Sequence, residues 1–345
     1  MPIRARRHLL SFYEHAVSWL GLIILLFYSY AFLVRAPYTG FHWQPDGRVF
    51  EIYVPATAGA TLRENDYLVQ IGPLSWTEFQ SNLRRRLFDG VQPGERVTLL
   101  IQRDGEIVTI PWRFPGFNRN QLLARLGSQW WLGYVFWLTG LAVLLFARPR
   151  DARWRLLIAF NFLTALWLVT GTVSAWRVWY SARVLRMALW LCIPVYWHLH
   201  WLFPAPLGHV RTVVWGVIYG LGIGLAGAEW FRLLPRDLFF LGFVFAAGGS
   251  WLLLAIHFLF QREQRRDILL LVLLALVAFL PAVAFGVAGT FSTISTLAGG
   301  ALLALPAVPL SYLFVAYRRQ LGGLELRANR LVSLYLFLIL LGTVF

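Results

Sequence analysis

Nine runs of strongly apolar residues divide this chain, and eight of them are long enough to cross a lipid bilayer. A membrane helix uses about 20 apolar residues to cross a hydrocarbon layer of about 30 Å. Backbone groups in lipid must be hydrogen-bonded within their own segment, so we expect these runs to be helices. The predicted spans are Ala16–Val34, Trp130–Ala147, Leu156–Trp176, Val184–Phe203, Val213–Phe231, Leu238–Phe260, Ile268–Val287 and Leu297–Tyr317. A ninth run extends from Leu331 to Phe345, so we expect a chain truncated within a ninth span.

The composition also places the chain in the membrane class. Hydrophobic residues make up 59% of the sequence, and 17 residues are Trp. A water-soluble monomer of this composition would expose apolar patches larger than such proteins usually carry. The fold class that we expect is an α-helical polytopic membrane protein with eight full spans and a truncated ninth.

The arginines predict how the chain is oriented in the membrane. All 31 basic residues are Arg, and a cytoplasmic N-terminus would leave 15 of them in cytoplasmic stretches and four in short outer loops. An excess of basic residues is typical of cytoplasmic loops. We therefore expect residues 1–15 and the loop 318–330 to be cytoplasmic. Residues 35–128, between the first and second spans, would then lie outside the cytoplasm.

The net charge of +15 is concentrated at the membrane edges. Residues 35–128 hold 11 Arg and 9 acidic residues, so this region contributes only +2. The remaining positive charge is expected to meet anionic lipid headgroups, which makes membrane lipids the first predicted partner. No basic stripe is concentrated on a soluble domain, so nucleic acid is not an expected partner.

Motifs for catalysis and metal binding are missing from the sequence. It contains neither His-Glu-x-x-His nor Gly-x-Ser-x-Gly, so we expect no catalytic residues and no cofactor in this chain. The single cysteine, Cys192, lies within a predicted span and predicts no disulfide. His198 and His200 are two residues apart, on different faces of a helix, which favours anchoring beside aromatic residues over a metal site.

The polar region between the first two spans has the pattern of a small α+β domain. Asp104-Gly105 is typical of a type I′ hairpin turn, and Ser75 or Thr77 can cap a helix. That helix would run through Phe79, Leu83 and Leu87, which share one face. The predicted strands are Phe41–Gln44, Arg48–Val54, Tyr67–Ile71, Arg96–Gln102 and Glu106–Trp112.

One stretch of this region resembles the signature of bacterial PDZ domains. The sequence from Ala58 to Gly72 reads Ala-Gly-Ala-Thr-Leu-Arg-Glu-Asn-Asp-Tyr-Leu-Val-Gln-Ile-Gly, and in that family small residues and a Leu precede Gly-Asp, an apolar strand and Asn-Gly. Asn65 stands where the family commonly has Gly, and Gly72-Pro73 where it has Asn-Gly. The resemblance implies a PDZ-like domain at about 36–115. The structural signature positions are Gly59, Leu62, Asp66 and Ile71.

The same resemblance implies a peptide groove. Thr39-Gly40-Phe41 falls where PDZ domains hold a peptide carboxylate with backbone N–H groups, and an edge strand beside such a loop can pair with an added peptide strand. The implied ligand-binding residues are Gly40, Phe41, His42, Trp43, Phe79 and Leu83. Two interpretations stay open, because such a domain can bind a peptide or protein C-terminus, or can pack against its own helices instead. Phe79 and Leu83, taken alone, are also typical core residues.

Polar residues within the apolar runs are the candidate sites in the membrane, because such residues are costly there. Arg186 and Glu229 lie near the outer ends of the fourth and fifth spans, at the same depth, so they could pair across neighbouring helices. His257 lies late in the sixth span, and Asn161 lies in the third.

The order of these parts resembles the input region of PDZ-containing bacterial sensor histidine kinases, among them the competence-pheromone receptor kinases. The segment from His198 to Phe203-Pro204 and the segment from Pro309 to Leu321 also resemble their helical array. The resemblance implies a membrane sensory module of a two-component system in the plasma membrane of a bacterium. It further implies a homodimer, a response regulator as partner, and a C-terminal kinase, missing here, that would use ATP and Mg.

Two other classes of function remain as alternatives. A membrane adaptor would use the PDZ-like domain to recruit envelope proteins, and its helices would serve only as an anchor. A transporter or an intramembrane enzyme is disfavoured by the small number of ionisable residues within the spans and by the lack of an inverted repeat.

Overall fold

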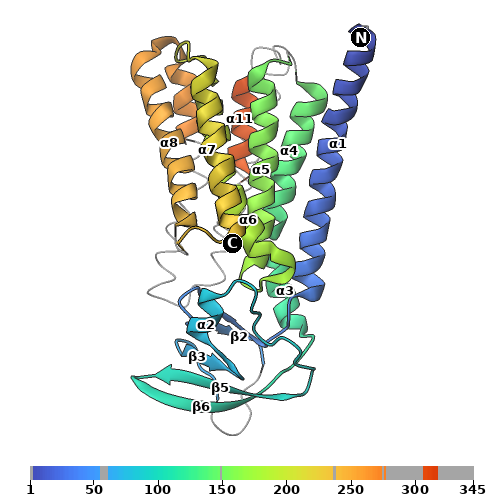
Figure 1. Ribbon diagram of the computed structural model, residues 1–345, viewed down its shortest axis with the longest axis vertical. Coiled ribbons are helices and arrows are strands. Elements are labelled where there is room, and N and C mark those ends of the chain that lie inside the picture. Colours follow the sequence, from blue (N-terminus) through green and yellow to red (C-terminus); the bar gives the residue numbers. More distant parts are fainter. Residues whose placement is uncertain are drawn as a thin grey trace, which may run out of the picture. The chain divides into compact units, whose positions relative to one another are not determined.

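The computed structural model of the chain describes residues 3–54, 61–147, 150–235, 238–273, 276 and 306–317 (Figure 1). The chain divides into two compact units. The first unit holds Met1–Leu25, Trp131–Leu168 and Arg186–Phe345, and the second holds Leu26–Trp130 and Val169–Leu185. The first unit is built from long helices, whereas the second contains every strand of the described part of the chain.

Within the part of the chain that the structure describes, six helices are long and apolar enough to cross a membrane. They are Ala16–Arg35, Gln129–Phe146, Ala152–Ser174, Val178–Leu202, Thr212–Phe231 and Phe239–Phe260. These ranges match the first six predicted spans, so the prediction of long apolar helices is confirmed there. The predicted spans Ile268–Val287 and Leu297–Tyr317 lie only partly within the described residues. The run from Leu331 and the predicted loop 318–330 lie outside them.

The helices of the first unit approach closely where small residues lie at their contacts. The long helices are α1 (Ile3–Tyr30), α4 (Leu132–Phe146), α5 (Ala152–Ser174), α6 (Ser181–Leu202), α7 (Thr212–Phe231), α8 (Phe239–Phe260) and α11 (Ala307–Tyr317). A Cβ added to Gly242 of α8 would lie 3.1 Å from the backbone of Leu189 in α6. One added to Gly222 of α7 would lie 2.9 Å from the ring of Pro194, also in α6. Small residues at such contacts allow membrane helices to approach each other.

The apolar surface of the first unit fits a lipid environment. Only 17% of the most apolar window of α7 and 22% of that of α8 is buried. Large side chains such as Leu221 and Phe260 are exposed instead. Exposed apolar patches of this extent mark surfaces that are covered by lipid or another partner.

The strands of the second unit form two antiparallel sheets. β1 (Phe41–Trp43) and β2 (Val49–Ile52) make a two-stranded sheet. β3 (Tyr67–Ile71), β4 (Leu74–Ser75), β5 (Arg96–Arg103) and β6 (Glu106–Arg113) make a four-stranded sheet in the order β4-β3-β5-β6. Phe41, Val49, Leu99 and Ile101 are 0% exposed and form the centre of the domain core.

The strands occur where the sequence predicts them, with ends that differ by a few residues. β3 has the predicted bounds, and the second predicted strand is shortened to β2. Asp104 and Gly105 have φ angles of 51° and 88°, so both turn residues lie in the left-handed region that a type I′ hairpin requires. Asn65, which stands where the resembled family commonly has Gly, also has a positive φ, of 72°. Asn tolerates this conformation better than most residues.

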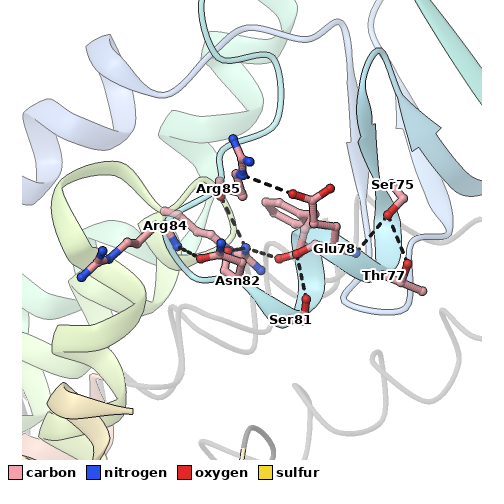
Figure 2. A network of polar contacts seen from close by, with 9 residues as sticks. Ser75, Thr77, Glu78, Ser81, Asn82, Arg84 and Arg85 are labelled. Carbon is pink, nitrogen blue, oxygen red and sulfur yellow. Dashed lines mark hydrogen bonds and ion pairs between the residues drawn. The ribbon is translucent and has the colours of Figure 1, made fainter.

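The predicted helix through Leu83 and Leu87 is shorter than expected. Helix α2 extends from Trp76 to Ser81, and Ser75 caps its start because its Oγ accepts the N–H of Glu78 at 3.1 Å (Figure 2). The helix ends because Asn82 is extended and its side chain accepts the N–H of Arg84 at 3.0 Å. Asn side chains compete in this way with the helical backbone. Leu83 is therefore half-buried in a turn and does not share a helix face with Phe79.

A helix that the sequence did not predict lies in the segment before the second span. Helix α3 extends from Arg119 to Gly127, and Asn118 caps it by accepting the N–H of Gln121 at 3.0 Å. The helix carries two fully buried polar side chains, Gln121 and Arg125. Gln121 contacts the backbone of Gly40, and Arg125 contacts the segment that follows α1.

Candidate functional site

The backbone loop that the PDZ resemblance assigns to a peptide carboxylate is closed by the domain itself. The N–H of Gly40 donates to Oε1 of Gln121 at 3.0 Å, and this bond is buried. Nε1 of Trp112 donates to the carbonyl of Thr39 at 2.9 Å, and Phe41 is 0% exposed in the core. The amide of Gly40 therefore already has its acceptor, and Phe41 serves as a core residue.

His42 and Trp43 are the accessible part of β1, and His42 belongs to a cluster of titratable groups. Its Nδ1 lies 3.0 Å from the Tyr53 hydroxyl and 3.6 Å from Oε2 of Glu51, and the Tyr53 hydroxyl donates to the same carboxylate. The hydrogen bond to His42 is the main cause that lowers the pKa of Glu51. Burial and the bond to Glu51 raise the pKa of Tyr53. Glu51 and Tyr53 are not among the residues predicted from the sequence, because only the register of β1 against β2 places Glu51 opposite His42.

Two residues from the loop between α5 and α6 contact both walls of the predicted groove. The ring of Trp176 meets that of Trp43 edge-on, with centroids 4.5 Å apart, and lies 6.1 Å from His42. The guanidinium carbon of Arg177 lies 3.6 Å from the ring centroid of Phe79. All of these residues belong to the second unit.

Arg177 also binds the backbone carbonyls at the end of α2. Its Nη1 donates to the carbonyl of Phe79 and to that of Asn82, the latter at 2.6 Å, with a longer contact of 3.4 Å to the carbonyl of Arg85. The last carbonyls of a helix have no partner within the helix and carry its negative partial charge. Arg177 therefore caps α2 beside Phe79, one of the residues that the PDZ resemblance assigned to a peptide groove.

Arg125 of α3 occupies a second arginine site, which is entirely interior. It is 0% exposed and donates to the carbonyls of Phe32 at 2.8 Å, Ala36 at 2.9 Å and Pro37 at 2.6 Å. Its guanidinium carbon lies 4.0 Å from the ring centroid of Tyr38. Burial lowers the pKa of Arg125 to about 10, so the side chain stays charged at neutral pH. This residue fastens α3 to the segment that follows α1.

The other signature residues have structural positions where they are described. Asp66 is buried, and its carboxylate accepts Nε of Arg103 at 2.8 Å and Nη2 at 2.7 Å. Leu62 and Ile71 are buried in the core. Gly59 lies outside the described residues.

Arg186 and Glu229 form an ion pair between α6 and α7, so the predicted pairing of these residues is confirmed. Nη1 of Arg186 lies 2.9 Å from Oε1 of Glu229, and both side chains are buried. The guanidinium of Arg186 also lies over the ring of Phe239, 4.4 Å from its centroid. Pairing offsets part of the cost of ionised groups within a span.

The two histidines of the fourth span contact different helices. His198 stacks on Trp215 of α7 with centroids 4.0 Å apart. His200 faces the other way, and its Nε2 lies 2.7 Å from the hydroxyl of Tyr312 in α11. This divergence follows from their spacing of two residues on one helix. Within the described residues, no group of three potential metal-ligating side chains is found.

His257 joins this polar network from α8. It is 0% exposed, with its Nε2 lying 2.7 Å from the carbonyl of His200 and its Nδ1 2.8 Å from Oε1 of Gln261. Asn161 of α5 is also buried and donates to the carbonyl of Leu157 in its own helix at 2.8 Å. These polar groups thus bond to the helices themselves.

Comparison with known proteins yields no relative for this chain. No family model matches it, and no curated protein or solved structure is significantly similar. The functional assignment therefore depends on the composition of the helices, the geometry of the second unit and the contacts of Trp176 and Arg177.

Proposed function

We propose that this chain is the membrane sensory input module of a bacterial signal-transduction histidine kinase. In this proposal a PDZ-like domain outside the cytoplasm detects a ligand, and the helices pass the change to a kinase beyond this chain. The observation that carries the proposal is the contact of Trp176 and Arg177 with β1 and α2. These two residues join α5 to α6, so a change at the domain surface acts directly on the connection between two spans.

The local geometry of the second unit supports the PDZ-like part of the proposal. Its strands and the helix α2 follow the expected order, and Asn65 adopts the left-handed conformation for which the family commonly uses Gly. Asp66, at the family's signature position, is held by Arg103. The bond from Gly40 to Gln121 departs from the family, and it moves the proposed contact surface to His42, Trp43 and the end of α2.

The polar groups of the spans support signalling more than transport. The charges of Arg186 and Glu229 compensate each other, and His257 is bonded to the backbone of α6 and to Gln261. Such bonds hold the helices in a defined arrangement. Allosteric coupling requires two such arrangements, between which a ligand shifts the equilibrium. The kinase with its ATP and Mg, the response regulator and the homodimer are parts of this same proposal.

The proposal is tested with the complete gene product in membrane vesicles, by measuring its autophosphorylation with labelled ATP. Replacing Arg177 by Ala is expected to change the basal rate several-fold, because it releases the domain from the α5–α6 loop. Arg96→Ala, an exposed residue of β5, is the matched control and is expected to leave the rate unchanged. A gene product without a kinase domain, or equal rates in the two variants, would overturn the proposal. An adaptor would also keep its activity after replacement of the helical array by an unrelated anchor, whereas a sensor would lose it.

A further inference from the structure

The contacts of the α5–α6 loop have the chemistry of a bound peptide. We propose that Trp176 and Arg177 are an internal ligand of a recognition site formed by β1 and the end of α2. The external ligand of this site is a peptide segment in which an aromatic residue is followed by arginine. This inference rests on the proposed function, because it names the ligand class and the regulation of the same domain.

The arginine half of the site explains why the ligand requires this residue. The guanidinium of Arg177 stacks on the ring of Phe79 while its Nη1 bonds the carbonyls of Phe79 and Asn82. A planar guanidinium can stack and donate in its own plane at the same time, whereas the ammonium of lysine is a point charge with different geometry. The carbonyls at the end of α2 supply the negative partial charge that the cation needs. The site therefore discriminates arginine from lysine.

The aromatic half of the site lies against β1. Trp176 is 6% exposed and meets Trp43 at an interplanar angle of 74°, the edge-to-face arrangement that aromatic pairs prefer. A cavity of about 230 Å³ adjoins it, lined by residues that include Phe32, Phe50 and Trp176 itself. The surface thus holds one indole and has additional space beside it.

The backbone of the loop favours release of the internal ligand. Arg177, Trp179 and Tyr180 have φ angles of 55°, 50° and 60°. This left-handed region is unfavourable for bulky residues other than glycine, so the side-chain contacts are made against backbone strain. The tethered loop has the advantage of a high effective concentration at the site. An external peptide can place the same side chains in the site without backbone strain, and this offsets that advantage. Displacement would allow residues 176–180 to relax at the junction of α5 and α6.

The test uses the full chain in lipid nanodiscs and a fluorescent synthetic peptide of residues 174–180, Ser-Ala-Trp-Arg-Val-Trp-Tyr. The double variant Trp176→Ala/Arg177→Ala, which vacates the site, is expected to bind this peptide at least about tenfold more tightly than the unmodified chain. A peptide with Lys in place of its Arg is expected to bind the variant at least about tenfold more weakly. Binding is measured by fluorescence anisotropy.

Three results would overturn the inference. The first is equal affinity of the peptide for the unmodified chain and the double variant, and the second is equal affinity of the Arg and Lys peptides. The third is loss of hydrogen-exchange protection in β5 and β6 of the double variant, because the loop would then be an integral part of the domain and no replaceable ligand. Autophosphorylation separates this inference from the proposed function. If Arg177→Ala changes kinase activity but the peptide does not bind, only the ligand class is refuted. If the peptide binds but Arg177→Ala has no effect on kinase activity, the sensory function is refuted.

Discussion

The buried carboxylate of Asp66 shows how one side chain ties the four-stranded sheet to the loop before β3. It is 2% exposed and bonds both Nε and Nη2 of Arg103, which itself donates to the carbonyl of Thr61 at 2.7 Å. The hydrogen bond to Asp66 raises the pKa of Arg103. Asp66 is buried whereas the side chain of Arg103 is 17% exposed, so loss of the carboxylate charge chiefly weakens the charge-assisted hydrogen bonds between them.

Replacing Asp66 by Asn is expected to lower the free energy of opening of the sheet by about 2 kcal/mol, because the charge-assisted hydrogen bonds to Arg103 are weakened. Hydrogen exchange of the β3 and β5 amides in the full chain measures this. Glu78→Gln is the matched control, since the Glu78–Arg85 pair has side chains that are 44% and 62% exposed. Its effect is expected to stay below about 0.5 kcal/mol. Equal effects of the two substitutions would contradict the structural role of Asp66.

Because of the cluster of His42, Glu51 and Tyr53, the stability of the domain is expected to depend on pH in the acidic range. The pKa of Glu51 is lowered in the folded chain from its ordinary 4.5, so the unfolded chain binds more protons in this range. The stabilisation by this carboxylate is therefore fully present above about pH 4.5 and is lost as the pH falls through the folded pKa. Glu51→Gln is expected to destabilise β1 and β2 at neutral pH and to flatten this acid-dependent loss. Hydrogen exchange over a pH series measures it, and identical pH profiles would refute it.

At the scale of elements, the contacts of α6 with its neighbours depend on small residues. Gly242 faces the backbone of Leu189, whereas Gly248, in the same helix α8, has no atom within 4 Å of an added Cβ. Backbone cannot give way as a flexible side chain can, so the two glycines should respond differently to the same substitution.

Gly242→Ala is expected to destabilise the helical unit by about 1–3 kcal/mol, because the new methyl group forces α8 away from α6. Gly248→Ala is expected to be neutral or stabilising by up to about 1 kcal/mol, since Ala is the better helix former. Thermal unfolding of the full chain in detergent measures both. The packing of α8 on α6 would be refuted if Gly242→Ala were as stable as Gly248→Ala.

Elements with strong local patterns were predictable from the sequence, and contacts between distant elements were not. The apolar runs and the Asp104-Gly105 turn determine their own local structure. The position where α2 ends depends on the side chain of Asn82, and a pattern of apolar residues gives no information about such a polar contact. The bond from Arg177 to the carbonyl of Asn82 joins residues 95 positions apart, so only the folded chain shows that Arg177 contacts the end of α2.

The orientation of the chain in the membrane is a property of the whole molecule. This part of the proposal depends on how the arginines are distributed along the sequence. Cysteine labelling tests it in a background where the buried Cys192 is replaced by Ala. A cysteine introduced at Ser81 is expected to react with a membrane-impermeant maleimide on intact cells, because residues 35–128 would lie outside. A cysteine at Arg153, which is also exposed, is expected to react only after the cells are opened. The reverse pattern would invert the topology and remove the basis for extracellular sensing.

The bond between the amide of Gly40 and Gln121 has a consequence for what kind of molecule could be a ligand. Since this amide is already bonded, the proposed recognition through His42, Trp43 and the end of α2 would need no free chain terminus. An aromatic–arginine pair could be read within the loop of an intact folded protein as well as in a short secreted peptide. A signal of that kind would require no protease to generate it, and its lifetime would be that of the protein that carries it.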